Sequence, residues 1–208
     1  MLAGLFPFAE GDAVLPVFLK LDGRRVLLVG GGRVAAGKLR PLLEARAKVT
    51  VVAPDIAPEI ASAPVTTARR AFQAEDLDGV SYVVAAAPRE VNAVVAREAG
   101  SRGLFVNAVD DVENASAYAG AILRRAGVTI AVSTDGDAPA LAGLLREGLE
   151  ALLPDDLDAW MGCAREARRR WLADGVPMER RRPLLLDALV ALYARSTAAA
   201  GVDQEPGR

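Results

Sequence analysis

The sequence predicts an α/β fold in which a doubly wound parallel sheet is followed by a smaller, mainly helical domain. Short β-compatible runs alternate with helical patterns between residues 26 and 133, as is typical of parallel sheets built with right-handed crossovers. A glycine-rich turn directly follows the first strong strand. Beyond Pro154 only helical patterns remain, in a segment rich in Arg, Leu and Ala.

The glycine turn joins a buried strand, Val26–Gly30, to a helix that is expected to run to about Arg46. In the pattern Gly30-x-Gly32-x-x-Ala35, the first glycine permits a tight turn, and the second lets a pyrophosphate approach the backbone. Ala35 is small enough for the helix to pack on the strand, and the positive end of the helix then faces the phosphates. These features predict a Rossmann-like dinucleotide-binding domain. The alternative is a tight glycine turn that binds nothing.

The other elements follow from short apolar runs and helical periodicity. Further strands are expected at 49–53, 65–68, 80–86, 104–107 and 128–133, and helices at 72–77, 88–100, 141–153 and 184–193. Residues 15–21 are expected as an edge segment beside the first strand, and 121–126 as a helical or connecting piece. Pro88 and Pro139 suit first turns of helices, and Asp137 is a candidate N-cap.

Four segments make up the predicted organisation. Residues 1–112 form a dinucleotide-binding domain, and 113–150 form a sheet extension that carries dimerisation and active-site residues. Residues 151–196 form a helical domain, and 197–208 form a disordered tail.

Composition limits the chemistry that this chain can perform. The 208 residues contain no histidine, the commonest general base and metal ligand, and we predict no metal site. The single cysteine, Cys163, cannot form an internal disulfide and fits a reducing compartment. The net charge of −2 gives no reason to expect nucleic acid. No signal peptide or membrane-spanning run is evident, so we predict a cytoplasmic protein with no membrane partner.

Polar residues follow the ends of several predicted strands, at the edge where open α/β sheets bind ligands. Asp55 is the acid nearest the end of the second strand, where it either grips a ribose or caps a turn. No Arg occupies positions 53–58 to receive a 2′-phosphate, which favours NAD over NADP.

Two further polar pairs follow later strands. Asp110 and Asp111 come directly after the fifth strand, where they form either an active-site pair or a solvated acidic turn. Ser133 and Thr134 follow the sixth, where they either line the crevice or serve the turn itself.

An ordered set of short motifs covers about Leu15–Pro154. They are Leu15–Leu19, Val29–Ala35 with Lys38, Val51–Pro54, Val91–Asn92, Val106–Asp111, Ala131–Gly136 with Pro139, and Leu149–Pro154. In this order they resemble the precorrin-2 dehydrogenases of sirohaem synthesis, some of which are also sirohydrochlorin ferrochelatases. The chain departs from that family's usual pattern at Ala87–Pro88, Tyr118–Ala121 and Ala138.

The resemblance implies oxidation of precorrin-2 to sirohydrochlorin with NAD as the electron acceptor, in a homodimer whose second domain covers the site. It implies cofactor contacts at the glycine turn and the adjacent strand ends, namely Gly30, Gly31, Gly32, Arg33, Val34, Pro54, Asp55 and Ala86. Asp110 is implied as the catalytic residue, and Asn107, Asp111, Ser133 and Thr134 are expected to contact the tetrapyrrole substrate.

The residue inventory is compatible with this reaction. Dehydrogenation needs a proton acceptor, and without histidine a carboxylate such as Asp110 is the natural candidate. Iron insertion stays open, because no His or paired Cys offers a transition-metal site. The competing interpretations are a non-catalytic NAD-binding regulatory module and an ordinary small-molecule dehydrogenase.

Overall fold

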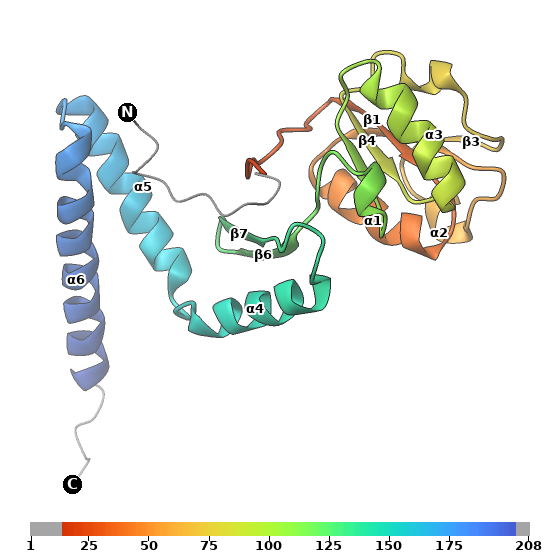
Figure 1. Cartoon of the computed structure of the whole chain (residues 1–208). Coiled ribbons are helices and arrows are strands. Elements are labelled where there is room, and N and C mark those ends of the chain that lie inside the picture. Colours follow the sequence, from red (N-terminus) through yellow and green to blue (C-terminus); the bar gives the residue numbers. More distant parts are fainter. Residues whose placement is uncertain (1–13, 203–208) are drawn as a thin grey trace, which may run out of the picture. The chain divides into compact units, whose positions relative to one another are not determined.

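The computed structural model describes residues 14–202, with side chains over residues 14–193 (Figure 1). It divides into two compact units, which are described separately below. The first holds the described residues through Gly120 together with Ser133–Pro139, and the second holds Ala121–Val132 and the described residues from Ala140 onward. The predicted segment 113–150 is therefore shared between the two units.

The first unit is built on a five-stranded, fully parallel sheet in the order β3-β2-β1-β4-β5. Its strands are β1 Arg25–Val29, β2 Lys48–Val52, β3 Thr66–Ala68, β4 Tyr82–Ala85 and β5 Val106–Ala108. The helices are α1 Arg33–Glu44, α2 Pro58–Ala61 and α3 Arg89–Gly100, with short 3₁₀ helices η1 Ala74–Leu77 and η2 Val112–Asn114. This arrangement confirms the predicted doubly wound fold. The strand order reverses between β1 and β4, which is where such sheets bind ligands.

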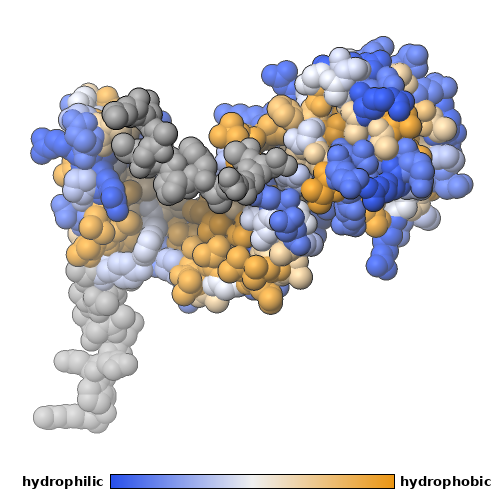
Figure 2. Space-filling model, viewed as in Figure 1, coloured by the Kyte–Doolittle hydropathy of each residue, from blue (hydrophilic) through white to orange (hydrophobic). Residues whose placement is uncertain are grey.

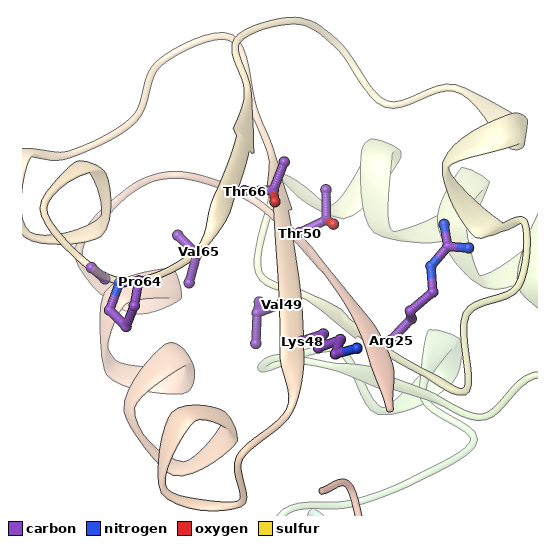
Figure 3. Close-up of a pocket in the computed structure, with 8 residues that line it drawn as sticks. Arg25, Lys48, Val49, Thr50, Pro64, Val65 and Thr66 are labelled. Atoms are coloured by element: carbon purple, nitrogen blue, oxygen red, sulfur yellow. The ribbon is translucent and has the colours of Figure 1, made fainter. Parts of the chain in front are cut away.

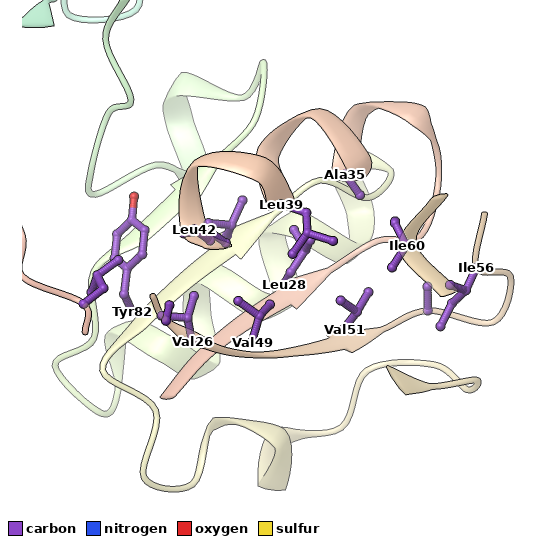
Figure 4. Packing of buried hydrophobic residues seen from close by; sticks show 14 residues of the cluster. Val26, Leu28, Ala35, Leu39, Leu42, Val49, Val51, Ile56, Ile60 and Tyr82 are labelled. Atoms are coloured by element: carbon purple, nitrogen blue, oxygen red, sulfur yellow. The ribbon is translucent and has the colours of Figure 1, made fainter. Parts of the chain in front are cut away.

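The sheet is covered on both faces, which explains why residues Val26–Val29 of β1 are all apolar rather than alternating with polar residues. On one face, Leu39 and Leu42 of α1 pack over Leu28 and Val49 (Figure 4). On the other face, α3 contributes to a second cluster that includes Leu27, Val83, Val95 and Val106. Each of these side chains is at most 6% exposed.

The second unit begins with a β-hairpin, which corrects two predictions. Residues 121–126 were expected to be helical or connecting, but Ala121–Arg125 is strand β6, and it pairs antiparallel with β7, Val128–Val132. β7 therefore belongs to a separate two-stranded sheet and does not extend the parallel one. Ala126 and Gly127 connect the strands with positive φ angles of 51° and 84°, as a tight two-residue hairpin turn requires.

Three helices complete this unit: α4 Pro139–Leu152, α5 Leu157–Ala173 and α6 Met178–Val202. The mainly helical second domain is thus confirmed, and α6 contains the predicted helix 184–193. Helix α6 continues to Val202, so residues 197–202 of the predicted tail are helical, while 203–208 lie outside the described residues. Between residues 14 and 202, no helix combines the length and apolarity needed to cross a membrane.

Two further local expectations differ from the structure. Residues 15–20 of the predicted edge segment form no strand, and Leu15, Val17 and Phe18 are largely exposed. Helix α4 starts at Pro139, so Asp137 is not its N-cap. Thr134 instead serves this turn, because its Oγ1 accepts the Ala138 N–H at 3.1 Å.

Candidate cofactor and carboxylate site

The first two glycines of the turn are required by close backbone packing. Gly30 has φ +122°, and a Cβ there would overlap the carbonyl of Ala86 at the end of β4. A Cβ on Gly31 would overlap the carbonyl of Asp55, just beyond β2. Gly30 N–H donates to Val52 O at 2.9 Å, and Ala57 N–H donates to Gly31 O at 2.8 Å. The glycine turn therefore fixes the ends of β1, β2 and β4 together.

Gly32 differs from its neighbours because it faces open space. No other part of the described chain comes within 4 Å of a Cβ built there. Gly32 is the N-cap of α1, with no side-chain cap and no acid in the first turn. The first helical hydrogen bond runs from Ala36 N–H to Gly32 O at 3.0 Å, which leaves the N–H groups of Arg33 and Val34 available to a ligand. This end of α1 fits the pyrophosphate of a dinucleotide.

The residues expected at the ribose side lie beyond β2. Pro54 and Asp55 are both exposed, and the Asp55 backbone packs on Gly31. The sequence reasoning missed Arg69, which is exposed and directly follows β3. Because Ala53 N–H donates to Ala68 O at 3.1 Å, Arg69 stands at the same sheet edge as Asp55. Its position immediately after a predicted strand was the available signal.

Arg70, next along the chain, is committed to an ion pair. Its guanidinium donates to both carboxylate oxygens of Asp76, at 2.8 and 2.5 Å. These hydrogen bonds hold the pKa of the Asp76 carboxyl below its usual value. Arg70 therefore ties the end of β3 to η1 and contributes to the local fold.

The predicted carboxylates lie beyond β5 and differ sharply in burial. Val109 N–H donates to Ala85 O at 2.8 Å, which holds the start of this loop against β4. Asp110 is exposed and has φ +55°, a conformation that Asp tolerates better than most residues. Asp111 is 7% exposed, and its Oδ2 accepts from Asn114 Nδ2 at 2.8 Å. Only Asp110 of this pair is available to a substrate.

Asp110 and the glycine turn share the carboxyl edge of the sheet. They follow β5 and β1, which are separated by β4 alone, so about 10 Å divides the two strand axes. Ala86, at the end of β4, lies between them, and its N–H donates to Val29 O at 2.8 Å. The structure thus brings Gly30–Gly32, Asp55, Ala86 and Asp110 to one edge.

The other expected substrate contacts are occupied by local hydrogen bonds. Asn107 is 7% exposed, and its Nδ2 donates to Ala117 O at 3.2 Å. Ser133 Oγ accepts Asp135 N–H at 3.1 Å, and Thr134 Oγ1 is used as described above. Both hydroxyls therefore take part in hydrogen bonds of the turn, and their contact with the substrate stays a prediction. A Cβ on Gly136 would lie 2.8 Å from Val112 Cγ2, so the turn packs beside the carboxylate loop.

A separate hollow of about 540 Å³ lies at the amino ends of β1, β2 and β3 (Figure 3). Its lining includes Arg25, Lys48, Thr50 and Thr66. This is the opposite edge of the sheet from the glycine turn, and none of the predicted site residues, all of which the structure describes, lines it. Within the described residues, no group of three or more His, Cys, Asp or Glu could hold a metal ion.

Comparison with known proteins agrees with this geometry. A family model described as NAD(P)-binding matches residues 17–121, and a model for the central part of sirohaem biosynthesis proteins matches residues 125–152. The chain belongs to the NAD(P)-binding family whose model matches residues 17–121, and its segment 125–152 is similar to the central part of sirohaem biosynthesis proteins. The nicotinamide-binding fold predicted from the glycine turn is therefore confirmed, without distinguishing NAD from NADP.

Several members of the sirohaem family are close in sequence. "Siroheme synthase 1" of Aeromonas salmonicida (strain A449) is 44% identical over 173 residues, which cover 81% of this chain and 37% of the relative. "Siroheme synthase" of Photorhabdus laumondii is 40% identical over 195 residues, covering 91% of this chain and 42% of the relative. The chain thus spans about two fifths of the length of these relatives.

A solved structure of similar size supports the same membership. "SirC, precorrin-2 dehydrogenase" aligns with a TM-score of 0.67 and 27% sequence identity, and the match covers 84% of this chain and 88% of that one. The sirohaem-family fold therefore extends over most of the described chain.

Proposed function

We propose that this protein is an NAD-dependent precorrin-2 dehydrogenase that oxidises precorrin-2 to sirohydrochlorin in sirohaem biosynthesis. The observation that carries the proposal is the shared sheet edge, where the open glycine turn and the exposed Asp110 stand two strands apart. The likeness to a precorrin-2 dehydrogenase over most of both chains supports the same reaction.

The chain's own residues have separable roles in this proposal. Gly32 and the N–H groups of Arg33 and Val34 hold the pyrophosphate, because a negative group at a helix N-terminus meets free donors and the positive end of the dipole. Asp55 is positioned to accept hydrogen bonds from ribose hydroxyls. The bound nicotinamide supplies the acceptor for two electrons and one proton.

Asp110 removes the second proton that leaves precorrin-2, and releases it to solvent. It is the exposed member of the Asp110–Asp111 pair. Its position after β5 gives it access to a substrate above the sheet edge without crowding the glycine turn. The overall change is therefore balanced: two electrons and one proton pass to the cofactor, and one proton passes to Asp110.

The choice between NAD and NADP depends on two opposite charges at the β2–β3 edge. Asp55 repels a 2′-phosphate, whereas Arg69 attracts one. Asp55 is the acid nearest the end of β2, three residues beyond Val52 and in the region where a ribose-binding acid is usual, so we propose NAD as the cofactor. Asp55→Asn should lower the preference for NAD over NADP, measured as the ratio of their kcat/KM values, and Arg69→Ala should raise it.

The proposed oligomer is a homodimer, supported by the apolar surface of α4. Five leucines on this helix are 37–80% exposed: Leu141, Leu144, Leu145, Leu149 and Leu152. Figure 2 shows the orange surface that they contribute to. Contiguous apolar surface of this kind is unusual on a monomer, and a second copy would present the same complementary face.

A cytoplasmic location remains a prediction.

The decisive experiment measures anaerobic NADH formation from precorrin-2 and NAD. Asp110→Asn should lower turnover by about 100-fold or more, since a positioned general base contributes that much. Asp137→Asn is the matched control, because Asp137 is also exposed and lies in the neighbouring turn. Normal turnover by Asp110→Asn would refute its role as the base. Cofactor binding without turnover by the wild type would favour the regulatory-module alternative, and addition of Fe²⁺ or Co²⁺ tests for chelatase activity.

A further inference from the structure

Asn92 is a buried polar residue of α3 that the proposed reaction leaves without a role. It is 1% exposed, the lowest value among the buried polar residues Asn92, Asn107 and Asp111. A buried amide is costly unless it is hydrogen-bonded. Its Oδ1 accepts the Ala87 N–H at 3.2 Å. The residue therefore ties the body of α3 to the turn that precedes it.

That turn, Ala86–Pro88, is held from β1 on one side and from α3 on the other. Ala86 N–H is bonded to Val29 O at 2.8 Å, and Pro88 has no N–H to offer. Pro88 is also the N-cap of α3, so its side chain makes no capping hydrogen bond. The Val91 and Asn92 N–H groups of α3 donate to the Pro88 carbonyl at 2.9 and 3.0 Å. The Asn92 side chain adds the bond to Ala87, the residue between Pro88 and the Ala86 carbonyl that faces Gly30.

The same turn packs tightly against Gly30 of the glycine turn. The Ala86 carbonyl occupies the space that a Cβ on Gly30 would need, and its carbon lies 2.7 Å from that position. Any displacement of Ala86 therefore changes the contact between its carbonyl and Gly30. This contact lies where the strand order reverses, between β1 and β4. Because interiors are close-packed, a small shift here reaches the cofactor loop directly.

We propose that Asn92 is a positioning residue for the nicotinamide cofactor, acting through the Ala87 N–H to hold the β4–α3 turn against Gly30. The inference rests on the proposed function only in requiring a bound nicotinamide dinucleotide. Asn92 sets the affinity for that cofactor, whereas the proton-accepting role belongs to Asp110.

A structural role alone would have a different signature, and α3 offers a matched control. Val95 lies three residues after Asn92, is 0% exposed and packs in the cluster beneath α3. Val95→Ala removes packing from the same helix and leaves the Ala87 hydrogen bond in place. Both Val95→Ala and Asn92→Ala should lower the melting temperature, but only the second should weaken cofactor binding.

The test measures NADH affinity without substrate, by fluorescence titration and by calorimetry, together with the melting temperature of each variant. Asn92→Ala should raise the Kd for NADH about tenfold, the effect of losing one well-placed hydrogen bond. Asn92→Asp keeps an oxygen acceptor at this position, so it should bind NADH more tightly than Asn92→Ala, while burial of its carboxyl group lowers the melting temperature. Asn92→Ser is the milder form of the change, for use if Asn92→Ala does not fold.

The outcomes separate this inference from the proposed function. An unchanged Kd in Asn92→Ala or Asn92→Ser, or an equal loss of affinity in Val95→Ala, would overturn the positioning role and leave the dehydrogenase proposal intact. NADH binding that weakens as expected, in a protein that never oxidises precorrin-2, would support the positioning role and refute the proposed reaction. Failure of the wild type to bind NADH would overturn both.

Discussion

The two units of this chain differ in how far their apolar residues are buried. In the first unit the sheet is covered on both faces, and the apolar residues of β1, β2, β4 and β5 are buried. In the second unit, within the residues whose side chains are described, the buried apolar residues are Leu123, Ala142 and Leu157. The five exposed leucines of α4 face solvent instead. The apolar residues of the first unit therefore form a closed core, whereas the leucines of α4 in the second unit form an exposed apolar surface.

The difference follows from what each element can cover. A parallel sheet flanked by α1 and α3 hides two apolar faces at once, because helices return across it after each strand. Helices α5 and α6 pack as a pair, with the Trp160 and Tyr193 rings edge to face at 5.7 Å, and two helices enclose little volume. The first unit has a closed core, whereas the second exposes apolar side chains on α4, the observation behind the proposed homodimer.

The largest effect on stability is expected at Gly31, where the first unit is most tightly packed. Gly31→Ala would drive a Cβ into the Asp55 backbone, which cannot move aside as a flexible side chain would. We expect a loss of about 3 kcal/mol in the free energy of unfolding, typical of overpacking, measured by urea denaturation. Gly32→Ala meets open space and should change stability by less than about 1 kcal/mol, while weakening NADH binding.

Comparing the Gly31 and Gly32 variants also tests how rigidly the Asp55 loop is held at the sheet edge. Equal stability of the two variants would mean that the Asp55 loop yields easily, and that the close packing at the sheet edge is not needed. Unchanged NADH affinity in Gly32→Ala would mean that the pyrophosphate does not use the open space above this residue.

The next effect probes the open surface of the second unit. Leu144 is 65% exposed on α4, and Leu144→Glu would place a charge in the proposed dimer interface. We expect the dimer dissociation constant to rise about 100-fold, since an unpaired buried charge is strongly unfavourable. Analytical ultracentrifugation over a range of protein concentrations measures it.

A control from the first unit makes this result specific. Phe105 is 62% exposed on the first unit, and Phe105→Glu should leave association unchanged. If Phe105→Glu disrupts the dimer and Leu144→Glu does not, the two units have the opposite roles to those proposed here.

Local patterns in the sequence were enough to predict most of the first unit. Strands β1, β2 and β4 are rich in apolar, β-compatible residues, and the Gly30–Ala35 turn has a distinct spacing, so both could be recognised without knowing the neighbours. The β6–β7 hairpin was missed because Ala126–Gly127 is a weak turn signal and β6 mixes apolar residues with arginine. Pairing with β7 decides its conformation, and pairing is not visible in a short window.

The site shows the same limit at the level of single residues. Asp110 and Asp111 are neighbours in sequence, but one is exposed and the other is buried against Asn114. Arg69 reaches the cofactor edge only because β3 pairs with β2. The hydrogen bond from Ala87 to Asn92 depends on how α3 meets β4. Such juxtapositions come from tertiary packing, which spacing along the chain does not encode.

The smallest expected effect concerns the closed core of the first unit and appears at alkaline pH. Tyr82 is 9% exposed at the start of β4 (Figure 4), and burial raises the pKa of its phenol to about 12, from the usual value of about 10. Between these values the unfolded chain loses the phenolic proton while the folded protein keeps it. Stability contributed by the neutral phenol is therefore fully present below about pH 10 and is lost as pH rises toward 12.

By pH 12 this loss should amount to roughly 2 kcal/mol in the free energy of unfolding. Tyr82→Phe has no proton to lose, so its stability should fall less steeply over the same interval, while at pH 7 the two proteins should unfold at similar urea concentrations. Urea denaturation at half-unit steps of pH measures both curves. Parallel curves for wild type and Tyr82→Phe would mean that water reaches the phenol readily, and that the first unit is less closed around β4 than its contrast with the second unit implies.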